Sequence, residues 1–312
     1  MRGCRDCEGS MKKKQIACPA GYQTPWEKIR PYVYILPAMF FLGVFVIYPL
    51  IDVVIRSFQK WNMITEPTWV GWSNYAYNFR RTEFKDAIVH TLTYALFVVG
   101  LGLSLSTLFA VWLSKKTFLN NLTRSVMFMP HVIALLSVAM VWAWIMNKDN
   151  GLLNMVLNFF GLPSLKWIDG SETAMMSVII VALWKAVGYN TMLIYAAIQN
   201  VPAELYEAAD LDNASSWKKF SKITLPMISP QMFMLLITAT TGSFRVFDTI
   251  RVMTHGGPGT STQVLVYYIY KQAFVLQGKV GYAFSAAVVL MLMIGVVTIA
   301  YFRVLSKRVH YQ

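Results

Sequence analysis

The distribution of charged side chains constrains this chain more than any other feature of the sequence. Six long stretches are almost free of Asp, Glu, Lys and Arg, and only Lys185 interrupts one of them. Each stretch can cross the hydrocarbon core of a membrane as a helix, which takes about 20 apolar residues. The stretches are Pro31–Ile51, Ala87–Ser114, Ser125–Asn147, Thr173–Pro202, Ile223–Phe244 and Val280–Phe302.

The composition supports a membrane location. Hydrophobic residues make up 56% of the 312 residues and charged residues only 14%, whereas soluble domains carry about 25% charged residues. A seventh charge-free stretch, Val252–Tyr270, contains Gly256-Gly257-Pro258-Gly259, which favours turns over a regular helix. We therefore expect an all-α integral membrane protein with six transmembrane helices and a loop in the seventh stretch.

The basic residues indicate which side of the membrane each loop faces. One set of segments, consisting of both ends of the chain and the loops 115–124 and 203–222, holds 16 Lys and Arg. The opposite loops are longer in total but hold only 11. By the positive-inside tendency the first set is cytoplasmic, so both termini face the cytoplasm. The net charge of +13 then reflects topology and contact with the lipid bilayer, and we expect no nucleic-acid partner.

This topology divides the chain into four parts. They are a cytoplasmic tail (1–30), a first transmembrane helix with its external loop (31–86), a core of five transmembrane helices with the cytoplasmic loop 203–222 (87–302), and a second cytoplasmic tail (303–312). Met11 precedes three lysines and is an alternative start, in which case residues 1–10 are artefactual. Cys4 and Cys7 form a lone CxxC, which is a weak metal signal, and we expect an irregular tail there.

Residues for catalysis or for energy conversion are not evident in the sequence. The Gly278-Lys279 pair lacks the rest of a phosphate-binding loop, and the four histidines lie in four separate segments without metal-ligand spacing. Paired acidic residues inside the spans, which a proton- or sodium-coupled carrier would use, are also missing. We expect a non-catalytic chain without a cofactor or metal of its own, driven by a partner or moving its solute downhill.

The loop between the fourth and fifth spans carries the most specific pattern. Pro202 suits the first turn of a helix. Glu207 suits the N-terminal end of that helix, where the helix dipole is positive. Asp212-Asn213 permits a turn, because Asn tolerates the left-handed conformation. A second short helix would follow with three apolar residues on one face: Trp217, Phe220 and Ile223. By itself this pattern also fits a pair of helices that pack on the lipid surface.

This loop resembles the EAA motif of the membrane subunits of binding-protein-dependent ABC importers. The pattern is Glu-Ala-Ala, then Asp-Gly-Ala, then Ile-x-Leu-Pro, at fixed spacing. The residues that match are Glu207, Ala208, Ala209, Asp212, Ala214, Ile223, Leu225 and Pro226. Asn213 stands where the family usually has Gly. Because both residues accept a left-handed backbone, we expect the loop geometry to be kept.

Two other runs are similar to the sugar-importer branch of that family. One is Met253–Pro258 with the tyrosines and the Ala-Phe pair that follow it, and the other is Trp69–Tyr75 in the first external loop. The resemblance extends over nearly the whole chain. It is closest to the group that contains the larger permease of the maltose importer and the glycerol-3-phosphate permeases. It implies the type I importer fold in a bacterial plasma membrane.

The resemblance also implies partners and a coupling site. The partners are a second homologous permease subunit, two cytoplasmic ATPase subunits that bind ATP and Mg, and an extracytoplasmic solute-binding protein. The ATPase-coupling residues would be Glu207, Ala208, Ala209, Asp212, Asn213 and Ala214. The alternative is that they only stabilise the loop. Residues expected to contact the binding protein are Gly256, Gly257 and Pro258.

A substrate pathway is expected on the helices before and after the loop. Lys185 and Tyr189 share one helical face, although Lys185 equally fits a lysine that extends to the membrane surface. Aromatic residues here can also serve packing, and a small polar run often joins helices. The candidate pathway residues are Lys185, Tyr189, Asn190, Thr240, Ser243, Phe244 and Phe247.

The sequence thus predicts the permease subunit of an ATP-driven importer for a carbohydrate, in particular an oligosaccharide. Glycerol-3-phosphate or another polar solute is the alternative cargo, and Lys185 with Arg245 does not decide between them. A self-sufficient secondary carrier and a receptor without transport are further alternatives. Copurification of an ATPase and a second permease would distinguish them.

Overall fold

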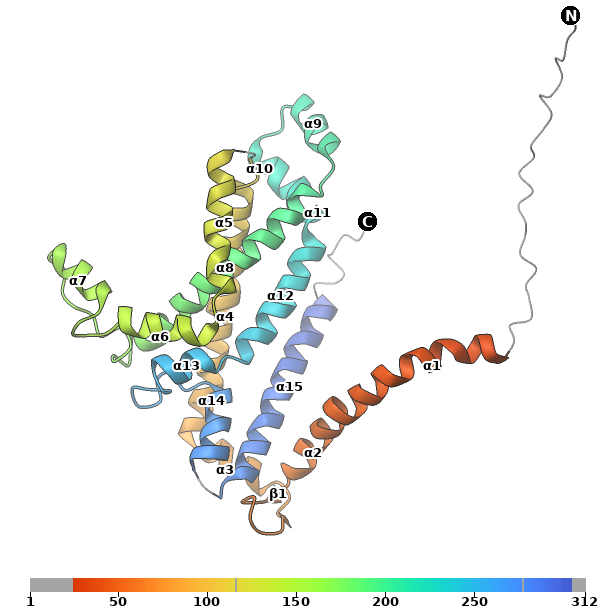
Figure 1. The fold of residues 1–312 in the computed structure, drawn as a ribbon, viewed down its shortest axis with the longest axis vertical. Helices are drawn as coiled ribbons and strands as arrows, with labels where there is room; N and C mark the ends of the chain where they lie inside the picture. The colour runs from red at the N-terminus through yellow and green to blue at the C-terminus, as the bar shows by residue number, and fades with distance from the viewer. Residues whose placement is uncertain (1–24, 116, 277, 305–312) are drawn as a thin grey trace, which may run out of the picture. The chain divides into compact units, whose positions relative to one another are not determined.

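A computed structural model describes residues 25–115, 117–276 and 278–304 of the chain (Figure 1). The CxxC motif, the alternative start and the end of the C-terminal tail lie outside these residues. Regular structure in the described ranges is nearly all helical. Two short strands, β1 (Gln59–Lys60) and β2 (Thr68–Trp69), pair antiparallel with Gln59 opposite Trp69.

The helical elements follow one another along the chain with short connections. In the first half of the chain they are α1 (Pro25–Leu42), the π-helical turn η1 (Gly43–Ile47), α2 (Tyr48–Arg56), α3 (Ser73–Arg80), α4 (Thr82–Trp112), α5 (Phe118–Val132), α6 (Leu135–Ile145) and α7 (Leu152–Phe159). The others are α8 (Ala174–Gln199), α9 (Ala203–Leu211), α10 (Ser216–Lys219), η2 (Phe220–Thr224), α11 (Leu225–Met227), α12 (Ser229–Phe244), α13 (Asp248–Met253), α14 (Leu265–Tyr270), η3 (Lys271–Val275) and α15 (Val280–Val304).

The chain separates into two compact units, residues 1–51 and 52–312. The described part of the first unit is helical and contributes most of an apolar helix over Tyr32–Arg56. The second unit holds the helices from the end of α2 onward, and all sites discussed below lie within it.

Among the described residues, four helices are long and apolar enough to cross a membrane: Tyr32–Arg56, Thr82–Trp112, Ala174–Gln199 and Val280–Val304. Two bent pairs also qualify, Phe118–Val132 with Leu135–Ile145 at 100° and Ser216–Met227 with Ser229–Met253 at 67°. If each pair is one crossing, the described part has six spans. The predicted all-α membrane architecture is confirmed, but two of the six expected helices are broken.

Prolines account for the positions of both breaks. Pro130 lies in the last turn of α5, and Pro226 and Pro230 flank Ile228, where α11 gives way to α12. A proline inside a helix removes a backbone donor and clashes with the preceding turn, so the helix bends or ends close to it. α12 ends at Phe244, the boundary expected from the sequence, and the separate short helix α13 follows it to Met253.

Close packing of α5, α8 and α4 forms the centre of the second unit. A Cβ atom added to Gly188 on α8 would lie 1.6 Å from the backbone oxygen of Met127 on α5. On the other side of α8, Ser106 of α4 donates a hydrogen bond to the Val187 carbonyl oxygen at 3.2 Å. Small residues and interhelical hydrogen bonds of this kind hold membrane helices together where lipid provides no hydrophobic driving force.

A hydrogen-bonded framework joins α3, α14 and α15 at the end of the unit opposite α9 (Figure 1). The Asn78 amide donates to the Tyr282 carbonyl oxygen at 2.9 Å and to Ser285 Oγ at 2.8 Å. The Tyr268 hydroxyl donates to Asn78 Oδ1 at 2.8 Å. Burial raises the pKa of the Tyr268 hydroxyl, so it keeps its proton as a donor. These bonds fix the segment that follows the Gly-Gly-Pro run.

Gly188→Ala is expected to destabilise the protein, because the new methyl group would overlap a backbone atom that cannot rotate away. Overpacking of this kind typically costs about 1–3 kcal/mol. Gly100→Ala in α4 is the matched control, since a Cβ there would meet nothing within 4 Å. Thermal unfolding of the detergent-purified variants measures the difference. Equal midpoints for the two variants would contradict the close α5–α8 contact.

Candidate functional site

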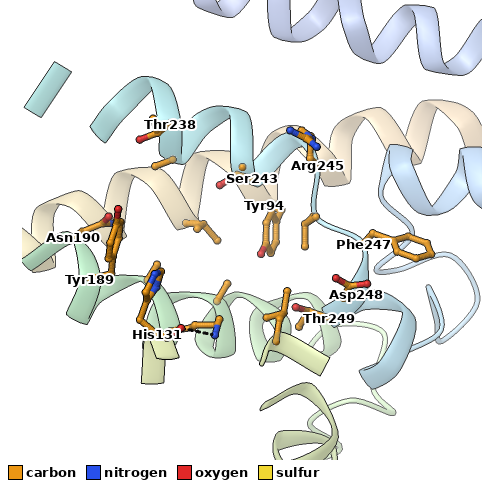
Figure 2. A pocket seen from close by; sticks show the side chains of 18 residues that line it. Tyr94, His131, Tyr189, Asn190, Thr238, Ser243, Arg245, Phe247, Asp248 and Thr249 are labelled. Atoms are coloured by element: carbon orange, nitrogen blue, oxygen red, sulfur yellow. Dashed lines mark hydrogen bonds between the residues drawn. The ribbon is translucent and has the colours of Figure 1, made fainter. Parts of the chain in front are cut away.

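A cavity of about 420 Å³ lies between α4, α5, α8 and α12 and reaches the start of α13 (Figure 2). Aromatic rings, hydroxyls, an amide and ionisable groups all line it, among apolar side chains. The polar and aromatic lining residues are Tyr94, His131, Lys185, Tyr189, Asn190, Thr238, Ser243, Arg245, Phe247, Asp248 and Thr249. Of the seven predicted pathway residues, five line this cavity: Lys185, Tyr189, Asn190, Ser243 and Phe247.

One wall of the cavity is a pair of stacked rings. His131 of α5 and Tyr189 of α8 lie 4.1 Å apart at their centroids with an interplanar angle of 12°. Tyr189 is 36% exposed, whereas the neighbouring Asn190 is buried at 8% exposure and also lines the cavity. The wall therefore combines a flat aromatic surface with an amide that can both donate and accept hydrogen bonds.

Lys185 lines the same cavity, but its ammonium group binds the protein backbone. Lys185 Nζ donates to the carbonyl oxygens of Ile133 at 2.5 Å, Pro130 at 3.2 Å and His131 at 3.4 Å. These carbonyls lie at the break between α5 and α6, where the helical pattern of bonds is interrupted. Lys185 is thus half-buried at the bend. The sequence left two alternatives, a lysine facing the pathway and one extending to the surface. In the structure Lys185 lines the cavity and also contacts the backbone at the bend.

The opposite wall comes from α4 and from the corner between α12 and α13. Figure 2 shows the Tyr94 and Asp248 side chains directed toward the open space. Arg245 and Asp248 are exposed, and neither forms a hydrogen bond or ion pair from its side chain within the described ranges. Both residues lie past Phe244, where the charge-free stretch of the fifth span ends. Tyr94 and His131 were not among the predicted pathway residues, because they lie on the second and third spans and not on the helices that flank the loop.

Two predicted pathway residues on α12 point elsewhere. Thr240 is buried and donates a hydrogen bond to the Tyr301 hydroxyl of α15 at 3.3 Å. Phe244 is only 2% exposed and does not line the cavity. Ser243 differs because it lies on the cavity side of the helix. The run of small polar residues on α12 therefore serves both helix contact and the cavity, according to the face on which each residue lies.

Lys185→Met should weaken the bend between α5 and α6, because it leaves three carbonyl oxygens without their donor. One lost hydrogen bond typically costs about 0.5–1.5 kcal/mol, and a loss in this range is expected because two of the three contacts are exposed. Lys185→Arg is the control, since it keeps a charged donor. The thermal unfolding midpoint in detergent is the measurement. A midpoint of Lys185→Met that equals that of the unchanged protein would show that the bend does not need this contact.

The loop 203–222 folds as the two short helices expected from its sequence. Asn213 adopts the predicted left-handed conformation with a φ of 51°, and Ala214 N donates to the Ala209 carbonyl oxygen at 2.9 Å. Ser215 then caps α10 by accepting a bond from Lys218 N at 3.3 Å. Pro202 precedes α9 instead of starting it. The expected second helix changes to a π-helical turn at Phe220.

The inner face of the loop is held by contacts, and its other face is free. On the inner face the hydroxyl of the half-buried Tyr206 lies 2.8 Å from Thr224 Oγ1, and the exposed Asp210 forms an ion pair with the half-buried Lys219. Glu207 and Ala208 are exposed. Glu207 has no side-chain partner within the described residues. Of the other predicted coupling residues, Asp212 and Asn213 are exposed, and Ala209 and Ala214 are half-buried.

The Gly-Gly-Pro run forms a tight turn between α13 and α14. Gly256 is buried with a φ of 78°, and a Cβ there would lie 2.5 Å from the Tyr267 ring. The Thr262 hydroxyl donates to the Gly257 carbonyl oxygen at 2.9 Å. Gly257 and Pro258 are half-buried. Gly256 therefore serves the shape of the turn, which leaves Gly257 and Pro258 as the predicted binding-protein contacts with accessible surface.

Metal ligation has no support in the part of the chain that the structure describes. No group of three or more His, Cys, Asp or Glu side chains gathers there. The CxxC motif of the tail lies outside that part.

The sequence of this chain matches a known family. Residues 99–311 match the model for the inner membrane component of binding-protein-dependent transport systems. The match covers α4 from its middle onward, the lining of the cavity except Tyr94 and Val98, and the whole EAA-like loop. The chain belongs to this family. It is accordingly a multi-pass membrane protein.

Curated relatives extend the similarity toward the N-terminus. The probable ABC transporter permease YurN of Bacillus subtilis is 36% identical, over 85% of this chain and 92% of its own length. The arabinooligosaccharides permease AraP of Halalkalibacterium halodurans is 34% identical over 88% and 86%. The sn-glycerol-3-phosphate permease UgpA of Escherichia coli is 31% identical over 90% and 96%.

A solved structure has the same fold. A chain in the crystal structure of a bacterial alginate ABC transporter, in complex with its pentasaccharide-bound periplasmic protein, superposes with a TM-score of 0.80. The identity is 22%, and the superposition covers 92% of this chain and 98% of that one. This likeness shows that the two chains share the same fold.

Proposed function

We propose that this inner-membrane component is the permease subunit of an ATP-driven importer for a carbohydrate, in particular an oligosaccharide, in a bacterial plasma membrane. A second permease subunit would complete the pathway and a binding protein would deliver the sugar from outside. Two cytoplasmic ATPase subunits would bind ATP and Mg, and the chain itself would catalyse no reaction. The names of the AraP relative and of the alginate transporter support this cargo class.

The cavity is the observation that carries the carbohydrate proposal. A sugar ring has apolar C–H faces and a rim of hydroxyl groups. The stacked pair of His131 and Tyr189 offers a flat aromatic surface, and the Asn190 amide and Ser243 hydroxyl offer hydrogen bonds beside it. The Asp248 carboxylate can accept bonds from sugar hydroxyls on the opposite wall. No single contact is specific, but the combination fits both surfaces of a sugar.

Coupling to an ATPase is proposed for the free side of the cytoplasmic loop. The inner face is held by Tyr206, Asp210 and Lys219, so the loop can transmit force as a unit. Glu207 and Ala208 remain exposed with nothing in the described chain to occupy them. A small side chain beside an unpaired carboxylate is suited to a close contact with basic groups of a partner.

Glycerol-3-phosphate is the alternative cargo, favoured by the name of the UgpA relative. A phosphate group needs several cationic donors. Lys185 binds three backbone carbonyl oxygens, so Arg245 is the one remaining lysine or arginine among the lining residues of the cavity. Asp248 on the same wall would repel an anion. These contacts favour an uncharged sugar over a phosphorylated solute.

The exposed charge of Glu207 provides a direct test of coupling. Glu207→Lys should abolish uptake and ATPase copurification while the protein still reaches the membrane, because a reversed charge repels the basic groups expected on the ATPase. Glu66→Lys makes the same charge change at an exposed position of the β1–β2 connection and should leave both unchanged. Normal uptake with normal copurification in Glu207→Lys would contradict the coupling role. A copurifying second permease would exclude a self-sufficient carrier and a receptor without transport.

The aromatic wall of the cavity provides a test of the cargo. Tyr189→Ala should lower sugar uptake about tenfold, because it removes the ring surface and a hydroxyl together, and one lost hydrogen bond alone costs about 0.5–1.5 kcal/mol. Tyr189→Phe keeps the ring and should lower sugar uptake less than Tyr189→Ala does. ATP hydrolysis stimulated by loaded binding protein should persist in both variants. Loss of assembly in Tyr189→Ala would instead show that the ring serves packing.

A further inference from the structure

A continuous row of aromatic side chains leads away from the cavity. Phe247, which lines the cavity, lies 5.1 Å from Tyr270 and 6.3 Å from Tyr267 between ring centroids. Tyr270 in turn lies 5.7 Å from Phe274. We call these four residues the aromatic strip. Each ring contacts the next, so the strip connects α13, α14 and η3 without a gap.

The strip becomes more exposed with distance from the cavity. Phe247, Tyr267 and Tyr270 are half-buried, whereas Phe274 is 69% exposed. In Figure 1, α13 is followed by α14 toward the end of the second unit that holds α3 and β1, away from α9. Figure 2 shows Phe247 at the edge of the cavity on the α13 side. The strip therefore runs from the cavity to a surface at the end opposite the coupling loop.

An arginine accompanies the rings. The guanidinium carbon of Arg251 lies 4.5 Å from the Tyr270 ring centroid and 5.7 Å from that of Phe247. The residue is exposed, and its guanidinium donates no hydrogen bond to the described part of the chain. Contact with the rings holds the planar group in place. Its five N–H donors remain available to a ligand that lies along the strip.

Rings in contact beside a fixed set of donors match the chemistry of a sugar chain. The apolar faces of successive sugar units can stack on the rings while their hydroxyls accept bonds from Arg251. The four rings extend over a length that several sugar units would occupy. A monosaccharide would not need a surface of this length. A strip that served only as a lipid-facing belt would not need to end in a polar cavity or to carry an unpaired guanidinium.

We propose that the aromatic strip and Arg251 form an entry track that holds successive units of an oligosaccharide on their way to the cavity. The inference rests on the proposed carbohydrate function and deepens it. The chain would accept extended oligosaccharides, with one unit in the cavity and the following units on the strip. Short sugars would depend on the cavity alone.

The test uses the complete transporter with both permeases, the ATPase and the binding protein in proteoliposomes. The probes are arabino-oligosaccharides and malto-oligosaccharides, each from the disaccharide to the pentasaccharide, supplied with saturating binding protein. Phe274→Ala should slow pentasaccharide uptake roughly three- to tenfold, the effect of losing one aromatic contact, and should leave disaccharide uptake within about twofold. Arg251→Met should behave in the same way. Phe274→Trp keeps a ring and should retain uptake.

Phe159→Ala is the matched control, because Phe159 on α7 is 85% exposed and does not contact the strip. Phe159→Ala should change neither the pentasaccharide nor the disaccharide uptake rate. A photoreactive phenylalanine derivative at position 274 should cross-link a radiolabelled pentasaccharide during transport, and the same derivative at position 159 should not.

Three outcomes would overturn the entry track. Equal losses for short and long sugars in Phe274→Ala would show a role in stability or in docking of the binding protein. Transport of disaccharides without pentasaccharides by the unchanged transporter would leave the carbohydrate function in place and remove the track. If the unchanged transporter moves no member of either series, the carbohydrate function fails and the track fails with it.

Discussion

The contact between the Lys185 ammonium and the backbone at the α5–α6 break is the interaction on which the cavity depends. Within a membrane, free carbonyl oxygens must find donors inside the protein. Lys185 provides one for three of them. The bent backbone in turn places His131 against Tyr189. Lys185, a half-buried cation that the sequence marked as a candidate for solute contact, therefore also stabilises the shape of the site.

The two functional regions are joined by the helices that carry them. α8 bears Lys185, Tyr189 and Asn190 and ends directly before the cytoplasmic loop, and α12 begins soon after the loop and bears Ser243. Tyr206 and Ile223 of the loop segment pack against the same hydrophobic core as both helices. A displacement of the loop can therefore reach both walls of the cavity through rigid elements. The proposed coupling to an ATPase would act on the cavity through this connection.

Charge spacing and turn chemistry were sufficient to predict the helical membrane class, the folded loop and the left-handed Asn213. They were not sufficient to predict the bends, because Pro130 is compatible with either a kinked or a nearly straight membrane helix. The cavity shows the same limit. Asp248 lies past the end of a charge-free stretch, and Tyr94 is on a helix far away in sequence, so only the three-dimensional packing brings them together. Thr240 and Ser243 differ by one helical turn, yet the neighbouring helix α15 directs one of them away from the cavity.

The central claim is that an ATPase-bound loop on the cytoplasmic side controls this membrane chain. Labelling of Ala208→Cys with a membrane-impermeant maleimide, in a background where the three native cysteines are replaced by serine, tests it most directly. The account predicts no labelling in intact cells, labelling after the cytoplasmic face is opened, and protection when the ATPase is bound. Labelling in intact cells, or labelling that bound ATPase does not reduce, would contradict it.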